Sequence, residues 1–94
     1  MEVVLNDLID KIADIKYMPE DVLKDSLLIE QRKDKIRLAS ILGTNYGKKT
    51  RLKLVTDSET VLLEEAIFAF DNQYVYLKGG VKIPIRAIEE VKLY

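Results

Sequence analysis

The chain contains no cysteine, no histidine and no tryptophan among its 94 residues. Without cysteine, disulfides, thiolate metal ligands and thiol nucleophiles are excluded. Without histidine, the imidazole ligands and the usual general base are missing. Because Ser26, Ser40 and Ser58 therefore have no histidine partner, a hydrolase triad of the usual form is excluded. These absences predict a protein that is not an enzyme and uses no cofactor or metal.

Long charged or apolar runs are also missing. Fifteen basic residues balance sixteen acidic ones, which gives a net charge of -1, so the strong general field of a polycation is not expected. No apolar run approaches the roughly 20 residues that a membrane helix needs. Glu2, Asp7 and Asp10 stand where a signal peptide would be basic. We expect a single cytoplasmic domain that has no membrane partner.

Residues 1–43 have the period of helices. Apolar residues recur there at spacings of three and four, beginning with Leu5, Leu8, Ile9, Ile12 and Ile15. Pro19 then suits the first turn of a second helix. That helix either spans Pro19–Leu42 without a break or restarts at Asp25-Ser26, with Ser26 as its natural cap. The sequence leaves both forms open, and it predicts an N-terminal helical segment of one or two helices. The apolar side of the second helix is predicted to hold Leu23, Leu27, Leu28, Ile36, Ala39 and Leu42, and its solvated side to hold Glu30, Arg32, Lys33, Asp34 and Arg37.

The boundary between helix and strand patterns lies at Gly43–Gly47. Gly43 is predicted to end the helix in the left-handed conformation, and residues 44–49 are predicted to form a loop. From residue 50 to residue 94 the period changes to two. Turn residues divide this part into five strand-like runs, at 51–55, 61–70, 74–78, 81–85 and 90–94.

These runs indicate a small antiparallel barrel. The run 61–70 is long enough that a small barrel would bend it, and Gly79-Gly80 suits a tight hairpin loop. Pro84 cannot donate to a ladder, so it belongs at an edge or a strand end. We expect an α+β chain in which the helical segment is followed by a five-stranded antiparallel SH3/Sm-like barrel at 50–94.

Two stretches carry a resemblance to known families. Residues 61–71, followed by 73–78, resemble the central strands of Sm-like proteins, especially the bacterial RNA chaperone Hfq, and Ala87-Ile88 is similar to the second motif of that family. Residues 48–94 are similar, more weakly, to the C-terminal barrel of the ribosome maturation factor RimP. In Sm-like proteins the subunits assemble into rings, and uridine-rich RNA binds around the pore. The resemblance implies single-stranded RNA or a ribonucleoprotein as partner.

The same resemblance suggests which residues would bind RNA. Gln73 and Tyr74 match the positions that hydrogen-bond to bases and stack on them, and Arg86 falls near the basic position at the pore. The residues themselves add a basic cluster that would attract phosphate. The predicted binding site is therefore Lys48, Lys49, Arg51, Gln73, Tyr74 and Arg86. The alternative is that the cations are a solvated strand start and the tyrosines pack within the sheets.

A second function remains open at this point. The apolar stripe of the helical segment either covers one end of the barrel or forms an interface with a second copy or another protein. An exposed barrel edge would serve the same purpose. Neither Glu64-Glu65 nor Glu89-Glu90 suggests a metal site, because adjacent residues on a strand point to opposite faces. The sequence indicates no small-molecule substrate.

Overall fold

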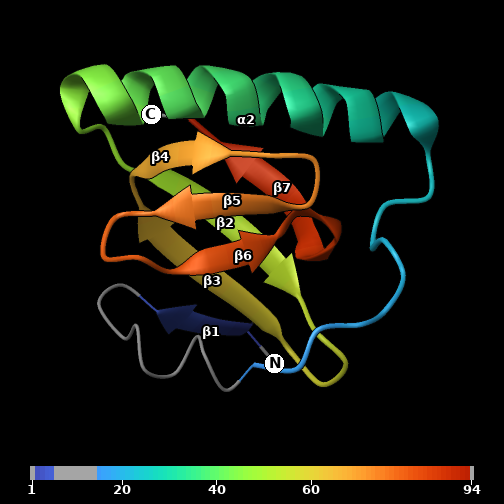
Figure 1. The fold of residues 1–94 in the computed structure, drawn as a ribbon. Helices are drawn as coiled ribbons and strands as arrows, with labels where there is room; N and C mark the ends of the chain where they lie inside the picture. Colours follow the sequence, from blue (N-terminus) through green and yellow to red (C-terminus); the bar gives the residue numbers. More distant parts are fainter. Residues whose placement is uncertain (1, 6–14, 94) are drawn as a thin grey trace.

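The computed structural model describes residues 2–5 as backbone and residues 15–93 in full. Its elements are β1 (Glu2–Leu5), α2 (Ser26–Tyr46), β2 (Thr50–Val55), β3 (Thr60–Glu65), β4 (Ile67–Phe70), β5 (Tyr74–Leu77), β6 (Lys82–Pro84), the 3-10 turn η1 (Ile85–Ala87) and β7 (Ile88–Lys92). The helix lies across the two sheets (Figure 1). One sheet has the order β1-β3-β2-β7, with β1 parallel to β3, and the other has the order β4-β5-β6. The predicted α+β class is confirmed.

The predicted five-stranded barrel is wrong in strand number and in closure. Six strands follow α2, because the run predicted as one bent strand is divided at Ala66 into β3 and β4, which belong to different sheets. The Ala66 carbonyl accepts a hydrogen bond from the Lys78 N–H at 3.1 Å, while the Glu65 carboxylate accepts from the Ala66 N–H at 3.0 Å. These bonds satisfy the peptide groups at the change of sheet. No ladder joins the two sheets within the described residues, so they do not form a closed barrel.

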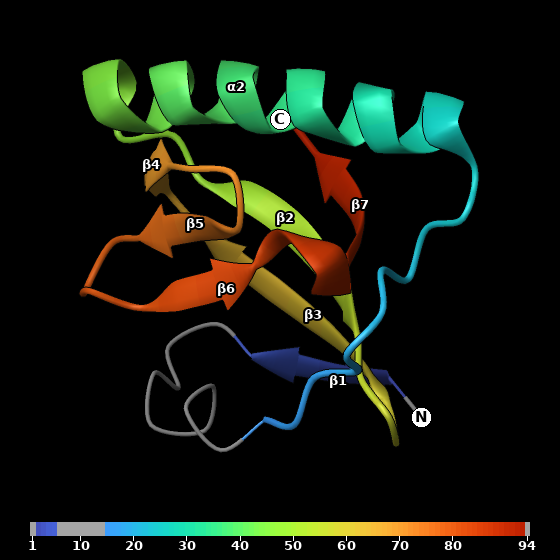
Figure 2. The same cartoon turned by 45° about the vertical axis from the view of Figure 1, so that its right-hand side comes forward.

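The N-terminal part also differs from the prediction. Leu5, expected in a helix, ends β1 and lies opposite Leu63 of β3. Residues 6–14 of that predicted helix lie outside the described residues, and Ile15, its last predicted member, is not helical. Residues 16–25 have no regular structure and form what we call the strap, which descends from the start of α2 along the side of the sheets (Figure 2). The helix start predicted at Pro19 is wrong, because no helix precedes Ser26 among residues 15–25. A helix does begin at Ser26, but its cap is Asp25, whose carboxylate accepts from the Leu27 N–H at 2.8 Å.

The helix continues past the predicted boundary. Gly47, at φ 65°, is the left-handed C-cap, and its N–H donates to the Gly43 carbonyl at 3.0 Å. Gly43 instead lies inside α2, where a Cβ would overlap the carbonyl oxygen of Ile67 in β4. The next residue, Thr44, donates its hydroxyl to the Phe68 carbonyl at 3.0 Å. The helix therefore covers the edge of β4 that pairs with no described strand, which protects this edge from pairing with another chain.

The core lies between α2 and the two sheets. Its buried members from the helix are Ile36 and Ala39. Those from the strands are Leu52, Leu54, Val61, Leu63, Ile67, Val75, Leu77, Ile83, Ile88 and Val91. In β2 the buried and less buried residues alternate, as the period of two predicts. In the part of the chain that the structure describes, no helix is both long and apolar enough to cross a membrane.

Candidate functional site

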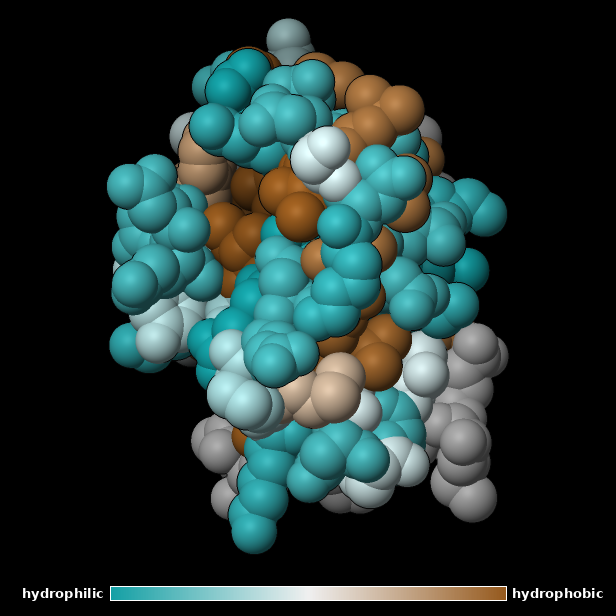
Figure 3. Space-filling view, turned by 90° about the vertical axis from the view of Figure 1, so that its right-hand side faces the viewer, coloured by the Kyte–Doolittle hydropathy of each residue, from teal (hydrophilic) through white to brown (hydrophobic). Residues whose placement is uncertain are grey.

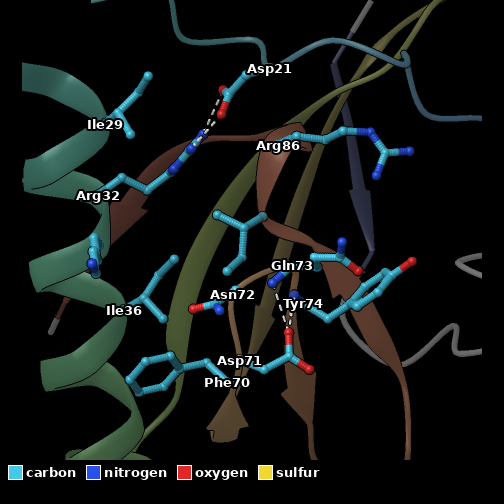
Figure 4. Close-up of a pocket in the computed structure, with 12 residues that line it drawn as sticks. Asp21, Ile29, Arg32, Ile36, Phe70, Asp71, Asn72, Gln73, Tyr74 and Arg86 are labelled. Carbon is cyan, nitrogen blue, oxygen red and sulfur yellow. Dashed lines mark hydrogen bonds and ion pairs between the residues drawn. The ribbon is translucent and has the colours of Figure 1, made fainter. Parts of the chain in front are cut away.

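A pocket of about 560 Å³ lies beside the first half of α2, facing η1 and the turn that joins β4 to β5. Figure 4 shows side chains from these elements and from the strap around it. Its lining is Asp21, Ile29, Arg32, Lys33, Ile36, Phe70, Asp71, Asn72, Gln73, Tyr74, Ile85 and Arg86. On the face where α2 begins, apolar side chains are visible in a recess between hydrophilic ones (Figure 3). Both the size and the mixed lining suit a small ligand or one unit of a polymer.

The turn between β4 and β5 is held by the carboxylate of Asp71. One oxygen accepts from the backbone N–H groups of Gln73 and Tyr74 at 2.8 and 2.7 Å, and the other accepts from the Tyr76 hydroxyl at 2.6 Å. The Tyr76 bond, followed by the two backbone bonds, holds the pKa of Asp71 below its usual value. The same bond to Asp71 raises the pKa of Tyr76. Asp71 thus fixes the turn that brings Gln73 and Tyr74 to the pocket.

The aromatic ring of Tyr74 already has one cationic neighbour. The Lys82 ammonium lies 4.5 Å from the ring centroid, which is a cation–π distance. The ring is half-buried and belongs to β5, where Tyr74 pairs with Pro84 of β6. This pairing gives the aromatic side chain a fixed position at the pocket.

Arg86 joins η1 to the strap. Its Nε donates to the Met18 carbonyl at 2.8 Å, and its own carbonyl accepts from the Val22 N–H at 2.9 Å. Nearby, the Tyr17 hydroxyl is buried without a hydrogen-bond partner among the described residues. Burial raises the pKa of Tyr17, and the positive charge of Arg86 opposes that rise. These contacts fix Arg86 and the strap against each other at the pocket.

The most buried charged group of the site is Arg32 on α2. Its Nη1 and Nη2 donate to the two carboxylate oxygens of Asp21 at 2.9 and 2.6 Å, and Nη1 also donates to the Ile88 carbonyl at 2.9 Å. This two-pronged bond to Arg32 is the main cause that lowers the pKa of Asp21. The Nε of Arg32 is buried and has no hydrogen-bond partner among the described residues.

The six predicted site residues fall into two groups. Gln73, Tyr74 and Arg86 line the pocket together. Lys48 and Lys49 are exposed just beyond the C-terminal end of α2, and that end lies about 20 Å along the helix from Arg32 at a rise of about 1.5 Å per residue. On β2, Arg51 has a guanidinium nitrogen 3.5 Å from the Glu64 carboxylate. The structure therefore separates the basic cluster from the pocket.

The sequence reasoning missed Arg32 in particular. It placed Arg32 among the solvated residues of the helix, whereas the structure buries it with Ile36, Ala39 and Gly43. Those positions follow one another at spacings of four, three and four, which is the period of one helix face. A charged residue in phase with that face is the signal that would have indicated a buried ion pair.

The predicted apolar face of α2 also differs from the face that is buried in the structure. It included Leu27 and Leu28, both of which are exposed. The missed pocket residues Asp21, Lys33, Phe70 and Asn72 carry no motif in the sequence. Folding alone brings them together.

The lining of the pocket carries charges of both signs. The pocket holds three cations and two carboxylates, and both carboxylates already accept hydrogen bonds from the protein. Residues 15–93 contain no group of three or more acidic, cysteine or histidine side chains placed to hold a metal ion. Comparison with protein families, with curated proteins and with solved structures found no match for this chain.

Proposed function

We propose that the protein is a non-enzymatic, cytoplasmic binding module that takes single-stranded RNA, free or in a ribonucleoprotein, in the pocket beside α2. The observation that supports this proposal is that Gln73, Tyr74 and Arg86 are all among the residues that line one pocket. An aromatic ring, an amide and a guanidinium are the groups that single-stranded RNA recognition combines, for stacking, base hydrogen bonds and phosphate attraction. The resemblance of the strands to Sm-like proteins points in the same direction.

The base would lie against the aromatic and amide side chains. Phe70 and Tyr74 offer ring surface, and Asn72 and Gln73 each offer one carbonyl acceptor and one NH₂ donor group. Because a carboxamide can meet either a donor or an acceptor on a base edge, these two residues suit the Watson–Crick edge of an unpaired base.

The phosphate would be attracted by the cations that the fold leaves without a carboxylate. Arg32 is neutralised by Asp21, whereas no ion pair is formed by Lys33 or Arg86 with a described acid. With Asp71 counted as well, the lining holds three cations against two carboxylates and has a small positive excess, although the chain as a whole has a net charge of -1. A local excess of this kind attracts a phosphodiester.

The test compares two lysines of the same helix. Lys33 lines the pocket, and Lys35 is exposed but outside the lining. Lys33→Gln should weaken the binding of a fluorescent uridine-rich RNA and reduce the slope of log K against log salt by about one, while Lys35→Gln should leave both nearly unchanged. The measurement is fluorescence anisotropy with uridine-rich and adenine-rich strands at two salt concentrations. Equal losses for both variants, or no binding by the wild type, would refute the pocket as an RNA site.

The separate basic cluster has a test of its own. If Lys48, Lys49 and Arg51 add phosphate contacts for a longer strand, their joint replacement by alanine should weaken a long RNA and flatten its salt dependence. A short oligonucleotide that fills only the pocket should be unaffected. An unchanged salt slope with the long strand would remove these three residues from the site.

A second candidate function is protein association through the outer face of α2. Leu27, Leu38 and Ile41 are 64%, 46% and 49% exposed, and their spacing places them on one side of the helix. Association through this face, with a second copy or another protein, would be insensitive to salt. Light scattering of the wild type and of Leu38→Glu/Ile41→Glu tests it, because a monomeric wild type at high micromolar concentration would contradict self-association.

A further inference from the structure

The carboxylate of Asp21 occupies the position where a bound anion would meet Arg32. We propose that Asp21 is an internal competitor, and that a phosphate group entering the pocket displaces it from the guanidinium. The phosphate belongs to RNA in the proposed function, on which this part of the inference rests, but inorganic phosphate carries the same chemistry. The two sources are separated by the experiments below.

The burial of the two partners is unequal. The Arg32 side chain is 5% exposed, whereas that of Asp21 is 30% exposed, and both line the pocket. Figure 4 shows the carboxylate and the guanidinium facing each other beside the pocket. Arg32 belongs to a regular helix and is also held by the Ile88 carbonyl, while Asp21 belongs to the irregular strap. In an exchange of partners, Asp21 is the group that moves.

The guanidinium has a donor that the fold does not use. Asp21 and the Ile88 carbonyl take three hydrogen bonds from Nη1 and Nη2, but the buried Nε–H has no partner among the described residues. Inorganic phosphate presents more acceptor oxygens than a carboxylate, and the two non-bridging oxygens of a phosphodiester can pair with Nε and Nη2 along one edge of the guanidinium. The incoming anion would therefore gain a hydrogen bond that Asp21 does not make.

Displacement would also affect the second arginine of the pocket. Val22, next to Asp21, donates to the Arg86 carbonyl, and the Arg86 Nε donates to the Met18 carbonyl of the same strap. Moving Asp21 outward loosens this part of the strap, which frees Arg86 for the ligand. The strap thus lowers the affinity of the empty pocket, and the first anion to bind removes that restraint.

The first experiment uses inorganic phosphate as the probe. Asp21→Ala leaves the guanidinium without its anion, and its melting temperature in sodium chloride should fall below that of the wild type. Exchange of chloride for phosphate at constant ionic strength should recover part of that loss, while the wild type changes little. Asp21→Ala/Arg32→Met, which lacks the guanidinium, should not respond. If Asp21→Ala does not fold, Asp21→Asn takes its place with the same expectation. A response equal in all variants would overturn the competitor role.

The second experiment uses uridine-rich RNA. Asp21→Asn should bind it about fivefold or more tightly than the wild type, as expected for a modest coupling between two competing groups. Glu20→Gln is the matched control, because it removes one acid of the same strap that pairs with Lys24 outside the pocket. Equal gains in RNA affinity for both variants would mean that the loss of any negative charge on the strap has this effect, and they would overturn the proposal. If phosphate restores the stability of Asp21→Ala but no variant binds RNA, the competitor role of Asp21 is supported and the RNA ligand is refuted. If RNA binds but phosphate restores no stability, the RNA ligand is supported and the competitor role is refuted.

Discussion

The contact between Gly43 and the carbonyl oxygen of Ile67 shows how one missing side chain positions an element. A Cβ at residue 43 would overlap a backbone atom that cannot rotate away, so α2 and β4 approach as closely as two backbones can. In the middle of a helix, glycine itself costs about 1 kcal/mol relative to alanine. The close approach must offset this cost, and it does so by bringing Ile36 and Ala39 onto the core.

Gly43→Ala should therefore destabilise the protein, although helix propensity alone predicts a gain. We expect the free energy of unfolding to fall by about 2 kcal/mol, as in other overpacked sites. Urea unfolding followed by circular dichroism measures it. Asn45→Ala, at an exposed position of the same helix, is the control and should be neutral or slightly stabilising. A gain in stability for Gly43→Ala would show that the two backbones can separate at no cost.

For single residues, the sequence predicted several members of the site but not the residues that they contact. Gln73 and Tyr74 were predicted from the resemblance to Sm-like proteins, in which the matching positions hydrogen-bond to bases and stack on them, and the structure places both in the lining of the pocket. Arg32 was missed because a charged residue on a helix is solvated by default. Its burial depends on Asp21 and Ile88, which lie 11 and 56 residues away along the chain.

Among the elements, α2 has the best-defined ends. Asp25 caps its first turn, and Gly47 ends it in the left-handed conformation. Asp25→Ala should lower the free energy of unfolding by about 1 kcal/mol, because the Leu27 N–H loses its acceptor. Ser26→Ala is the natural comparison, since Ser26 was the cap that the sequence suggested. Thermal unfolding of both variants decides between them: a larger loss for Ser26→Ala would contradict the observed cap.

Strand periods were predicted well, and strand partners were not. The alternation of buried and less buried residues in β2 follows from the local sequence. So does the turn before β5, in which the Asp71 carboxylate accepts from backbone N–H groups. At Ala66, where the run 61–70 is divided, the carbonyl accepts a hydrogen bond from Lys78, the residue that follows β5. The parallel pairing of β1 with β3 likewise joins segments that are distant in sequence. Neither the division at Ala66 nor the pairing of β1 with β3 produces a periodic pattern in the sequence of a single strand.

For the whole molecule, the Asp21–Arg32 bond ties the strap to the helix in a pH-dependent way. The pKa of Asp21 is lowered on folding, so the bond contributes stability above the usual value of about 3.9 and loses it as the pH falls through the lowered pKa. Asp21→Asn should cost about 1–2 kcal/mol at pH 7, and the difference from the wild type should shrink below pH 4.

Urea unfolding of both proteins at pH 7, 5 and 3 measures this difference. Asp71, whose pKa is also lowered, is present in both proteins, so it drops out of the comparison. A difference that is as large at pH 3 as at pH 7 would mean that the charge of Asp21 does not stabilise the fold.

The bond from Arg32 to the Ile88 carbonyl has a consequence for the order in which the new chain can fold. The partner of Arg32 is synthesised 56 residues later, which at the usual rate of translation is about 3 to 11 s. During that interval α2 can form its own turns, but the surface on which Ile36 and Ala39 pack is incomplete. A nascent chain thus carries an exposed apolar helix face until β7 is made, and this interval is when a ribosome-bound chaperone would have a surface to hold.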